Sequence, residues 1–496
     1  MKTFCQPQLF RWIALVVALL PAGCTVGPDF KKPAAPSVTS YTSEPVTLTN
    51  ATTSGDSQRL VSGQDISGEW WELFHTQSLN DLIERSLRAN PNLKAAQAAL
   101  AIAHENILAQ KGGYYPSVAG GFSAARQKTS SQISPTPNSG ALYYNLFTPQ
   151  VSVSYTPDVF GLNRRTVESL KAQEAQTRFA LIATHITLSA NVVAAAIQEA
   201  SLREQIAATH ELIAINTNML QILRNQLAQG SASQLDVAAQ ESQLAQVTAT
   251  LPPLLTQLAQ QRDLLSVLAG EFPGKGLSEK FDLSSLQLPR ELPLSLPSQL
   301  VEQRPDVRQA EENLHAASAQ VGIAVANRLP NLTLTADAGT MALEAGQMFA
   351  GGAGFWTLAG NVTQPIFQGG MLLHRQRAAQ AAFVQAAEQY RSAVLTAFQN
   401  VADTLNALEQ DANALNAAVN AKTAAGTTLE ITRRQLQSGS ANYLAVLSAE
   451  QTYQQAVINL VQAQANRYAD TAALFQALGG GWWNRTEFAK NPNCGN

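Results

Sequence analysis

Two segments of the chain are each 68 residues long and are bracketed by glycine at both ends. They are residues 162–229, between Gly161 and Gly230, and residues 371–438, between Gly370 and Gly439. Ordinary globular helices run about 8–20 residues, so segments of this length indicate a coiled coil or a helical repeat. At a rise of about 1.5 Å per residue, each segment would form a helix roughly 100 Å long. The chain must therefore build a long helical structure, and it builds it twice.

The repeat extends beyond these glycines. Pro116 follows Pro91 by 25 residues, and Pro330 follows Pro305 by the same interval. A unit of about 210 residues is too long for a solenoid, whose repeats run about 20–50 residues. Chance matching in an alanine- and glutamine-rich chain is the alternative, but it does not explain why the spacings agree along the whole unit. We predict shorter helices beside the long ones, at 81–111, 232–269, 298–327 and 440–478.

The composition argues against a catalytic or nucleic-acid-binding protein. Charged residues are 14% of the chain and the net charge is -3, without the basic run that nucleic-acid binding requires. The three cysteines, Cys5, Cys24 and Cys494, have no metal-ligand spacing, and no two histidines are closer than 25 residues. No phosphate-binding, dinucleotide-binding or catalytic-serine motif occurs. We predict no enzyme activity, no cofactor, no metal and no nucleic acid.

The N-terminus reads as an export signal. Lys2 and Arg11 precede a nine-residue apolar run, and small residues follow it up to Cys24. The run is too short for a transmembrane helix, which needs about 20 apolar residues. Small residues before a cysteine resemble the bacterial lipobox, which makes Cys24 the lipid-modified, palmitate-bearing first residue of the mature chain. Pro21 departs from the usual leucine, and ordinary cleavage beside an incidental cysteine is the alternative. Thr25 favours export to the outer membrane.

Each half carries one candidate membrane hairpin, at about 117–157 and about 331–364. Within them, residues 150–156 and 356–363 alternate apolar and polar side chains. Runs of about ten alternating residues are typical of outer-membrane strands, with apolar side chains toward lipid. A half-buried soluble sheet is the alternative, because it shows the same alternation.

Four strands cannot close a barrel, and lipid does not tolerate open strand edges. We find no later stretch that would span a membrane as a helix, so a membrane-crossing chain must oligomerise into a β-barrel. Eight strands would leave an interior filled by side chains. A channel therefore needs more than two copies of the chain.

Three segments cannot continue a helical wall: 25–80, the proline-rich 273–297 and 479–496. We predict that they pack together as a mixed belt, with Trp70, Trp71, Trp482 and Trp483 in its core. The predicted organisation is a signal peptide at 1–23, a lipidated N-terminal and equatorial part at 24–80, a first repeat at 81–270, an equatorial linker at 271–297, a second repeat at 298–480 and an equatorial tail at 481–496.

Residues 24–33 (Cys-Thr-Val-Gly-Pro-Asp-Phe-Lys-Lys-Pro), the Trp70-Trp71-x-x-Phe74 box, Asn90-Pro91-x-Leu93 and the two hairpins resemble TolC-like outer-membrane efflux factors. The branch they are most similar to is the NodT-type lipoproteins that serve resistance-nodulation-division pumps. The resemblance implies a fold of α plus membrane β: a homotrimer whose 12-stranded barrel, four strands from each chain, continues into a periplasmic helical tunnel. It also implies a periplasmic adaptor (a membrane fusion protein) and an inner-membrane pump as partners.

In this family the turns after Gly230 and Gly439 form a periplasmic tip that closes the tunnel. The resemblance places Asp236 at the position of a tip aspartate, whereas Ala445 and Ser448 stand where relatives carry aspartates, so a second acidic ring is missing. The alternative for Asp236 is a helix N-terminal charge that complements the macrodipole. Further gate candidates are the cations Arg224, Arg433 and Arg434, the anions Glu241 and Glu450, and the packing residues Leu235, Tyr443 and Leu444. We expect some of the charges to pair between neighbouring helices.

The function that the sequence favours is the outer-membrane channel of a tripartite efflux system, a passive exit duct anchored by lipid and extending into the periplasm. A type I protein-secretion channel is one alternative. A periplasmic coiled-coil scaffold lipoprotein without a pore is another, but a scaffold would not need two hairpins of membrane length. The transported substrates are not encoded in any motif of the sequence.

Overall fold

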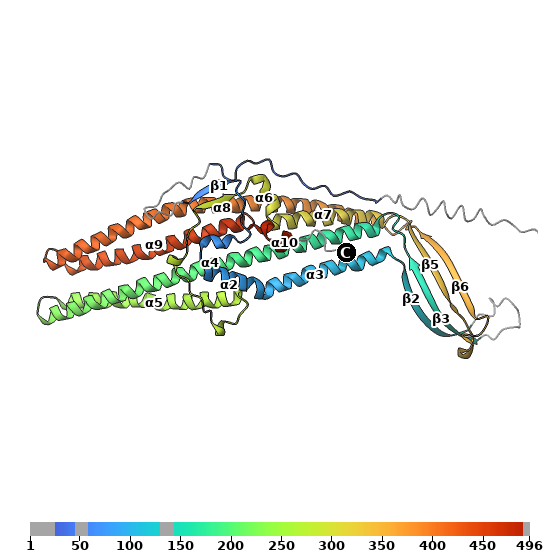
Figure 1. Cartoon of the computed structure of the whole chain (residues 1–496), viewed down its shortest axis with the longest axis horizontal. Coiled ribbons are helices and arrows are strands. Elements are labelled where there is room, and N and C mark those ends of the chain that lie inside the picture. The colour runs from blue at the N-terminus through green and yellow to red at the C-terminus, as the bar shows by residue number, and fades with distance from the viewer. Residues whose placement is uncertain (1–24, 45–57, 129–142, 490–496) are drawn as a thin grey trace, which may run out of the picture. The chain divides into compact units, whose positions relative to one another are not determined.

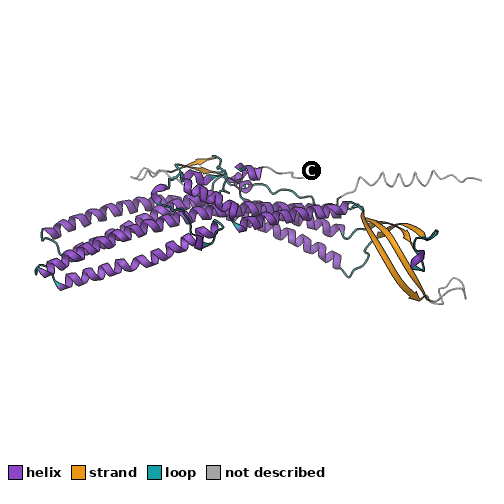
Figure 2. Ribbon diagram, turned by 60° about the horizontal axis from the view of Figure 1, so that its bottom comes forward, coloured by secondary structure: helices purple, strands orange, loops and turns teal. Residues whose placement is uncertain are grey.

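The computed structural model describes residues 25–44, 58–128 and 143–489 (Figure 1). The described chain is mainly helical, with fewer strands (Figure 2). The helices are α2 (Gln77–Ala89), α3 (Pro91–Lys111), α4 (Leu162–Ala228), α5 (Gln234–Leu268), α6 (Pro297–Gln303), α7 (Pro305–Ala326), α8 (Met371–Gln437), α9 (Tyr443–Ala477) and α10 (Thr486–Ala489). The strands are β1 (Arg59–Ser62), β2 (Ser117–Lys128), β3 (Tyr143–Tyr155), β4 (Glu291–Leu294), β5 (Asn331–Thr340) and β6 (Gly354–Thr363).

The two long helices predicted from the glycine-bounded segments are confirmed as α4 and α8, each of 67 residues. Both end in the same local structure. Gly230 and Gly439 each have φ 74°, a left-handed conformation that glycine adopts without steric cost. The N–H of the residue after each glycine bonds back to Gln226 or Gln435, at 2.9 Å in both cases. This Schellman pattern satisfies the last carbonyls of the helix and turns the chain back.

The shorter helices differ from the prediction in one respect. The sequence predicts one helix for each of the segments 81–111 and 298–327, but each is split, into α2 and α3 and into α6 and α7. The breaks fall at Pro91 and Pro305, each the first residue of the second helix. Proline lacks an N–H donor and disfavours helical geometry in the preceding residue, so a helix stops before it and a new one begins on it.

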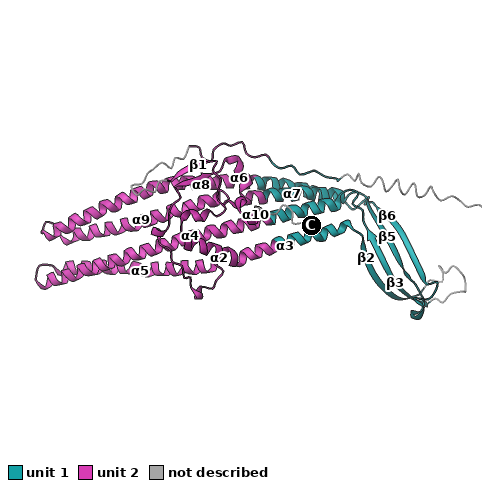
Figure 3. Cartoon of the chain, viewed as in Figure 1, with its two compact units in different colours: residues 1–33, 100–177, 310–390 teal, residues 34–99, 178–309, 391–496 magenta. Residues whose placement is uncertain are grey.

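The chain divides into two compact units (Figure 3). Unit 1 comprises residues 1–33, 100–177 and 310–390, and unit 2 comprises 34–99, 178–309 and 391–496. The helices α3, α4, α7 and α8 contribute residues to both units.

Unit 1 contains the two hairpins in one antiparallel sheet of order β2-β3-β5-β6. The connection between the halves is the β3·β5 pair, in which Gln150 lies opposite Gly339 and Tyr155 opposite Leu334. A methyl group at Gly339 would lie 2.3 Å from the Pro149 carbonyl oxygen, so only glycine fits this position of the sheet.

Unit 2 holds the three non-repeat segments against one another. β1 of the N-terminal segment pairs in parallel with β4 of the linker. From the C-terminal segment, the Asn484 side chain donates to Asp65 Oδ2 and to the Ile66 carbonyl oxygen, both at 2.7 Å. The described parts of the three segments in unit 2 therefore pack together as predicted, whereas residues 25–33 belong to unit 1, so the prediction is wrong for that stretch.

The tryptophan prediction is correct for one pair and only partly correct for the other, in which Trp482 packs against the buried Phe179. Trp70 and Trp71 are buried, and Trp70 stacks on Phe475 with ring centroids 5.2 Å apart. Trp482 and Trp483 are only half-buried. Their indole N–H groups donate to the Gln303 carbonyl oxygen and to Asp65, which explains their position at the edge of the core.

The expectation that no later helix could span a membrane is wrong by length and composition. Within the described residues, α4 contains one 18-residue stretch that is long and apolar enough, and 67% of that stretch is buried inside the protein. Such burial is typical of a core helix.

Candidate functional site

The sheet of unit 1 brings apolar side chains to one face. Residues directly opposite each other in antiparallel strands point to the same side of a sheet. Two rows of such residues cross all four strands: Val118, Val153, Ala336 and Leu358, and next to it Gly120, Val151, Ala338 and Trp356. The pairing register therefore places apolar residues from all four strands next to one another on one side.

This apolar face is exposed in the single chain. The exposed fraction is 78% for Trp356 and 74% for Leu358. A contiguous apolar patch on a water-soluble surface is unusual, whereas an outer-membrane strand presents such a band to lipid. On the opposite face, the middle of the sheet is polar, with Ser152, Asp337 and Thr357 in one row.

The two outermost strands of this sheet have free edges. Among the described residues, β2 pairs only with β3 and β6 only with β5. Each edge exposes a row of backbone N–H and C=O groups, which hydrocarbon cannot satisfy. In hydrocarbon, both edges would therefore need a partner strand.

In unit 2, the tip turn between α4 and α5 is fixed by a capping box. The Ser233 hydroxyl accepts from the Asp236 N–H at 3.1 Å, and the Asp236 carboxylate accepts from the Ser233 N–H at 2.9 Å. The Ser233 hydroxyl and N–H bonds hold the pKa of the Asp236 carboxyl below its usual value. Asp236 thus caps the α5 N-terminus, where its charge complements the helix dipole.

Two ion pairs join neighbouring helices at the tip. Arg224 on α4 pairs with Glu241 on α5 at 2.8 Å, and Arg433 on α8 pairs with Glu450 on α9 at 2.9 Å. The first pair is about half exposed, whereas the Glu450 side chain is only 3% exposed. The two paired residues are 17 positions apart in the sequence in both cases, because the two hairpins are equivalent parts of the repeat. The other candidate cation, Arg434, pairs with Glu430 one turn earlier in its own helix.

A buried polar chain connects the two helical hairpins of the tip. The Tyr443 hydroxyl of α9 donates to Gln240 of α5. The Gln240 amide donates to Asn216 of α4, at 2.9 Å to the carbonyl oxygen and 3.0 Å to Oδ1. Gln240 and Asn216 are fully buried. Burial raises the pKa of the Tyr443 phenol, so the hydroxyl stays a donor at neutral pH.

The apolar candidates at the tip lie in two environments. Tyr443 is 5% exposed and packs in a cluster with Leu220, Leu223 and Val237. Leu235 and Leu444 are 71% and 51% exposed in the single chain. Tyr443 therefore holds the hairpins together, and the two leucines are available to contact something else.

The sequence reasoning missed Gln240 and Asn216. The signal available was a polar side chain at a position where α5 or α4 faces its neighbour, but glutamine and asparagine are so common in this chain that such a position does not stand out. The lipidation candidate Cys24 lies outside the described residues.

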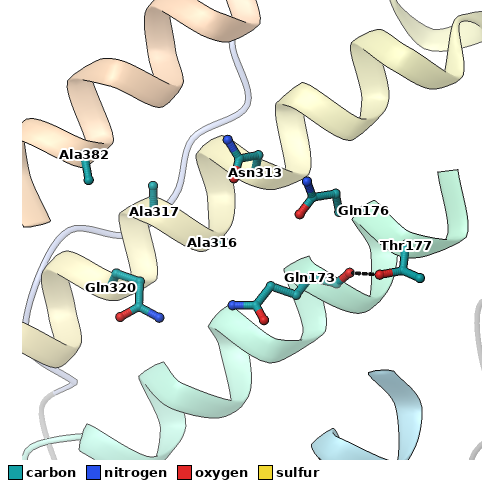
Figure 4. A pocket seen from close by; sticks show the side chains of 8 residues that line it. All are labelled: Gln173, Gln176, Thr177, Asn313, Ala316, Ala317, Gln320 and Ala382. Carbon is teal, nitrogen blue, oxygen red and sulfur yellow. Dashed lines mark hydrogen bonds between the residues drawn. The ribbon is translucent and has the colours of Figure 1, made fainter. Parts of the chain in front are cut away.

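Unit 1 also has a pocket of about 470 Å³ between α4, α7 and α8 (Figure 4). All eight lining residues are uncharged: Gln173, Gln176, Thr177, Asn313, Ala316, Ala317, Gln320 and Ala382. Amide and methyl groups offer hydrogen bonds and contact area, but no acid, base or nucleophile of useful reactivity at neutral pH. This pocket has no catalytic constellation.

Comparison with known proteins defines the class. The family model described as outer membrane efflux protein matches residues 82–271 and 296–480. These ranges are more than half of the chain, so the chain belongs to the outer membrane efflux protein family. It is an outer-membrane protein of an efflux system, and the resemblance stated from the sequence is confirmed.

The individual relatives agree along the whole chain. The toluene efflux pump outer membrane proteins TtgC and TtgF of Pseudomonas putida are 28% and 30% identical to it. The alignments cover 95% of this chain in both cases, and 95% of TtgC and 96% of TtgF. The structure of the outer-membrane channel OprN superposes with a TM-score of 0.83 at 25% identity, covering 92% of this chain and 100% of that one. The fold is therefore that of the TolC-like outer-membrane channels.

Proposed function

We propose that three copies of the chain form a passive exit duct whose barrel has 12 strands, four from each copy. The observation that carries the proposal is the sheet with two free edges and one exposed apolar face. Pairing β6 of one copy with β2 of the next would satisfy every edge and place the apolar face toward lipid. The polar face with Asp337 and Thr357 would then line the lumen.

The duct would work with a periplasmic adaptor and an inner-membrane pump, and would carry out no reaction itself. The names of the relatives support efflux of small molecules over type I protein secretion, since they are toluene, antibiotic, pyoverdine and cation efflux proteins. The two-faced sheet supports a channel over a scaffold without a pore. The neutral pocket of unit 1 is consistent with a wall that does not select its cargo by charge.

In this proposal the domain organisation is the one that the sequence predicts. Residues 1–23 are the signal peptide, and the segments 24–80, 271–297 and 481–496 form the equatorial belt, except that residues 25–33 belong to unit 1. The two strand pairs of unit 1 form the membrane hairpins. The turns at Gly230 and Gly439 form the periplasmic tip, with Arg433–Glu450, Arg224–Glu241 and the Tyr443–Gln240 contact holding its resting form.

The first test is the assembly state. We expect the detergent-extracted protein to run as a trimer whose β-structure survives until heating dissociates it, because each copy supplies only part of a closed barrel. Analytical ultracentrifugation in mild detergent measures the mass, and planar bilayers measure conductance. A stable monomer that still conducts ions would contradict the proposal.

The second test concerns the N-terminus. We expect Cys24 to be the first residue of the mature chain and to carry acyl chains, each buried CH₂ of which contributes about 0.8 kcal/mol of membrane affinity. Because the barrel itself is embedded, Cys24→Ser should impair sorting more than anchoring. Intact-mass spectrometry reads out the modification. An unmodified Cys24 at the mature N-terminus would rule out lipidation.

A further inference from the structure

The first described residues of the chain are docked in a fitted site within unit 1. We define residues 25–33 as the strap. The Val26 N–H donates to the Phe160 carbonyl oxygen at 3.3 Å. A methyl group on Gly27 would lie 2.4 Å from the Gly322 Cα, and one on Gly161 would lie 2.8 Å from the Thr25 methyl carbon. The strap therefore lies where glycines allow backbone to approach closely.

One buried arginine binds the strap. The Arg165 side chain, on the first turn of α4, is 4% exposed. Its guanidinium donates to the Val26 carbonyl oxygen at 3.0 Å, to the Gly27 carbonyl oxygen at 3.3 Å and to Asp29 at 2.7 Å. It also pairs with Glu168 of its own helix at 2.7 Å. Three of these acceptors belong to the strap, so detaching the strap would remove most of the hydrogen bonds of a buried cation.

One histidine contacts the strap and two carboxylates together. The ring of Phe30 stacks on the ring of His315 of α7, with centroids 4.3 Å apart and planes 14° apart. His315 Nε2 lies 3.2 Å from Glu168 of α4, and Nδ1 lies 3.5 Å from Glu312. Neutral imidazole has one N–H, so it can donate to only one of these carboxylates. Imidazolium donates to both and also attracts the face of the stacked phenyl ring.

The charges around His315 favour its protonated form. Helix α7 contributes the carboxylates Glu311 and Glu312, and α4 contributes the carboxylate Glu168 and the cation Arg165. The strap adds the carboxylate Asp29 and the cation Lys32, which lies 3.8 Å from Glu311. Hydrogen bonds, first to Glu312 and then to Glu168, raise the pKa of His315 despite its partial burial. Because the pKa is raised, the contacts of protonated His315 stabilise the docked strap fully below the ordinary histidine pKa. This stabilisation is lost as the pH rises through the raised pKa.

We propose that the strap is a pH-dependent clasp, tight when His315 is protonated and looser when it is neutral, which holds the N-terminal segment at the junction of β3 and α4. Thr25, the first described residue and the one that follows Cys24 in the sequence, lies against Gly161, so the clasp fixes the start of the described chain. The proposal goes beyond the exit-duct function, and it holds whether or not Cys24 carries lipid.

Spin-label mobility of the strap tests the clasp. A nitroxide on Lys31→Cys, in a Cys494→Ser background of the full-length protein in detergent, reports on the residue next to Phe30. The spectrum of the parent without Lys31→Cys is subtracted. We expect the mobile fraction to rise about twofold between about pH 5.5 and about pH 8, the range across which histidine loses its charge. His315→Gln should be mobile at both pH values, and His374→Gln, an exposed histidine of α8, should keep the rise.

Two results would overturn the clasp: no change of mobility with pH, or an unchanged rise in His315→Gln. Asp29→Asn provides a test that leaves the helices intact, because Asp29 is exposed and belongs to the strap itself. It should increase mobility at both pH values while the pH-dependent rise persists. A spectrum identical to that of the parent label would show that the Arg165–Asp29 ion pair does not hold the strap, and the proposal would fail on that ground as well.

Discussion

Leu358→Arg is expected to abolish assembly of the proposed outer-membrane trimer. Leu358 is near the middle of β6, on the apolar face of the sheet, and is 74% exposed in the single chain. An arginine facing lipid at the middle of a membrane strand costs about 2–4 kcal/mol, and an assembly of three chains incurs this cost three times. Such a total is comparable to the whole stability of many domains, about 5–15 kcal/mol. Outer-membrane fractions should lose the heat-modifiable band, and cells should lose efflux-dependent resistance.

The matched control is the preceding residue. Thr357→Arg places the same side chain on the opposite, polar face, directly across from Asp337. An opposite-charge pair across strands contributes roughly 0.2–1 kcal/mol, so this variant should assemble normally. If both variants assemble, or if neither does, the assignment of the two faces is wrong.

Much of the fold could be predicted because it is determined by local chemistry. Gly230 and Gly439 end the long helices because each adopts the left-handed conformation that glycine alone accepts easily. A single residue type is therefore enough to predict each helix end. The alternation along β3 and β6 likewise specifies a strand with two different faces. The helix prediction was wrong at Pro91 and Pro305. The rule that a helix stops before a proline applies to both positions, but the prediction rested only on the length of the repeated segments.

The parts of the site that could not be predicted depend on contacts between distant residues. Gln240 and Tyr443 are 203 residues apart, and Arg165 and Val26 are 139 apart. Nothing in the local sequence distinguishes Gln240 from the many exposed glutamines of this chain. The charges at the tip show the same limit, because spacing alone allows Asp236, Arg433 and Arg434 to pair between helices. The structure gives Asp236 and Arg434 partners in their own turn or helix, and of these three only Arg433 joins two helices.

Arg433→Ala is expected to loosen the tip more than any other single charge removal there. The Glu450 side chain is 3% exposed, and Arg433 is its ion-pair partner at 2.9 Å. The second carboxylate oxygen of Glu450 has no hydrogen-bond partner among the described residues. The Arg433 side chain is 36% exposed, so only the Glu450 end of the pair is buried. Removing one partner of a fully buried pair costs about 3–5 kcal/mol, and removing Arg433 should cost less than this while leaving the buried Glu450 charge without its partner. A gate shifts from 1:99 to 99:1 with about 5.5 kcal/mol, and an assembly of three chains incurs the loss three times. Single-channel conductance in planar bilayers should rise, and cells should become sensitive to large antibiotics.

The repeat supplies the matched control. Arg224→Ala removes the equivalent pair with Glu241 at the other hairpin, where both side chains are about half exposed. An exposed pair contributes about 0.2–1 kcal/mol, so conductance should change little. A second comparison separates charge from packing: Arg433→Met combined with Glu450→Leu removes both charges and keeps the volume, and buried pairs replaced in this way are often neutral or stabilising. The double variant should therefore close again. Equal conductance of Arg433→Ala and Arg224→Ala would mean that the Tyr443 cluster, and not this ion pair, holds the resting tip.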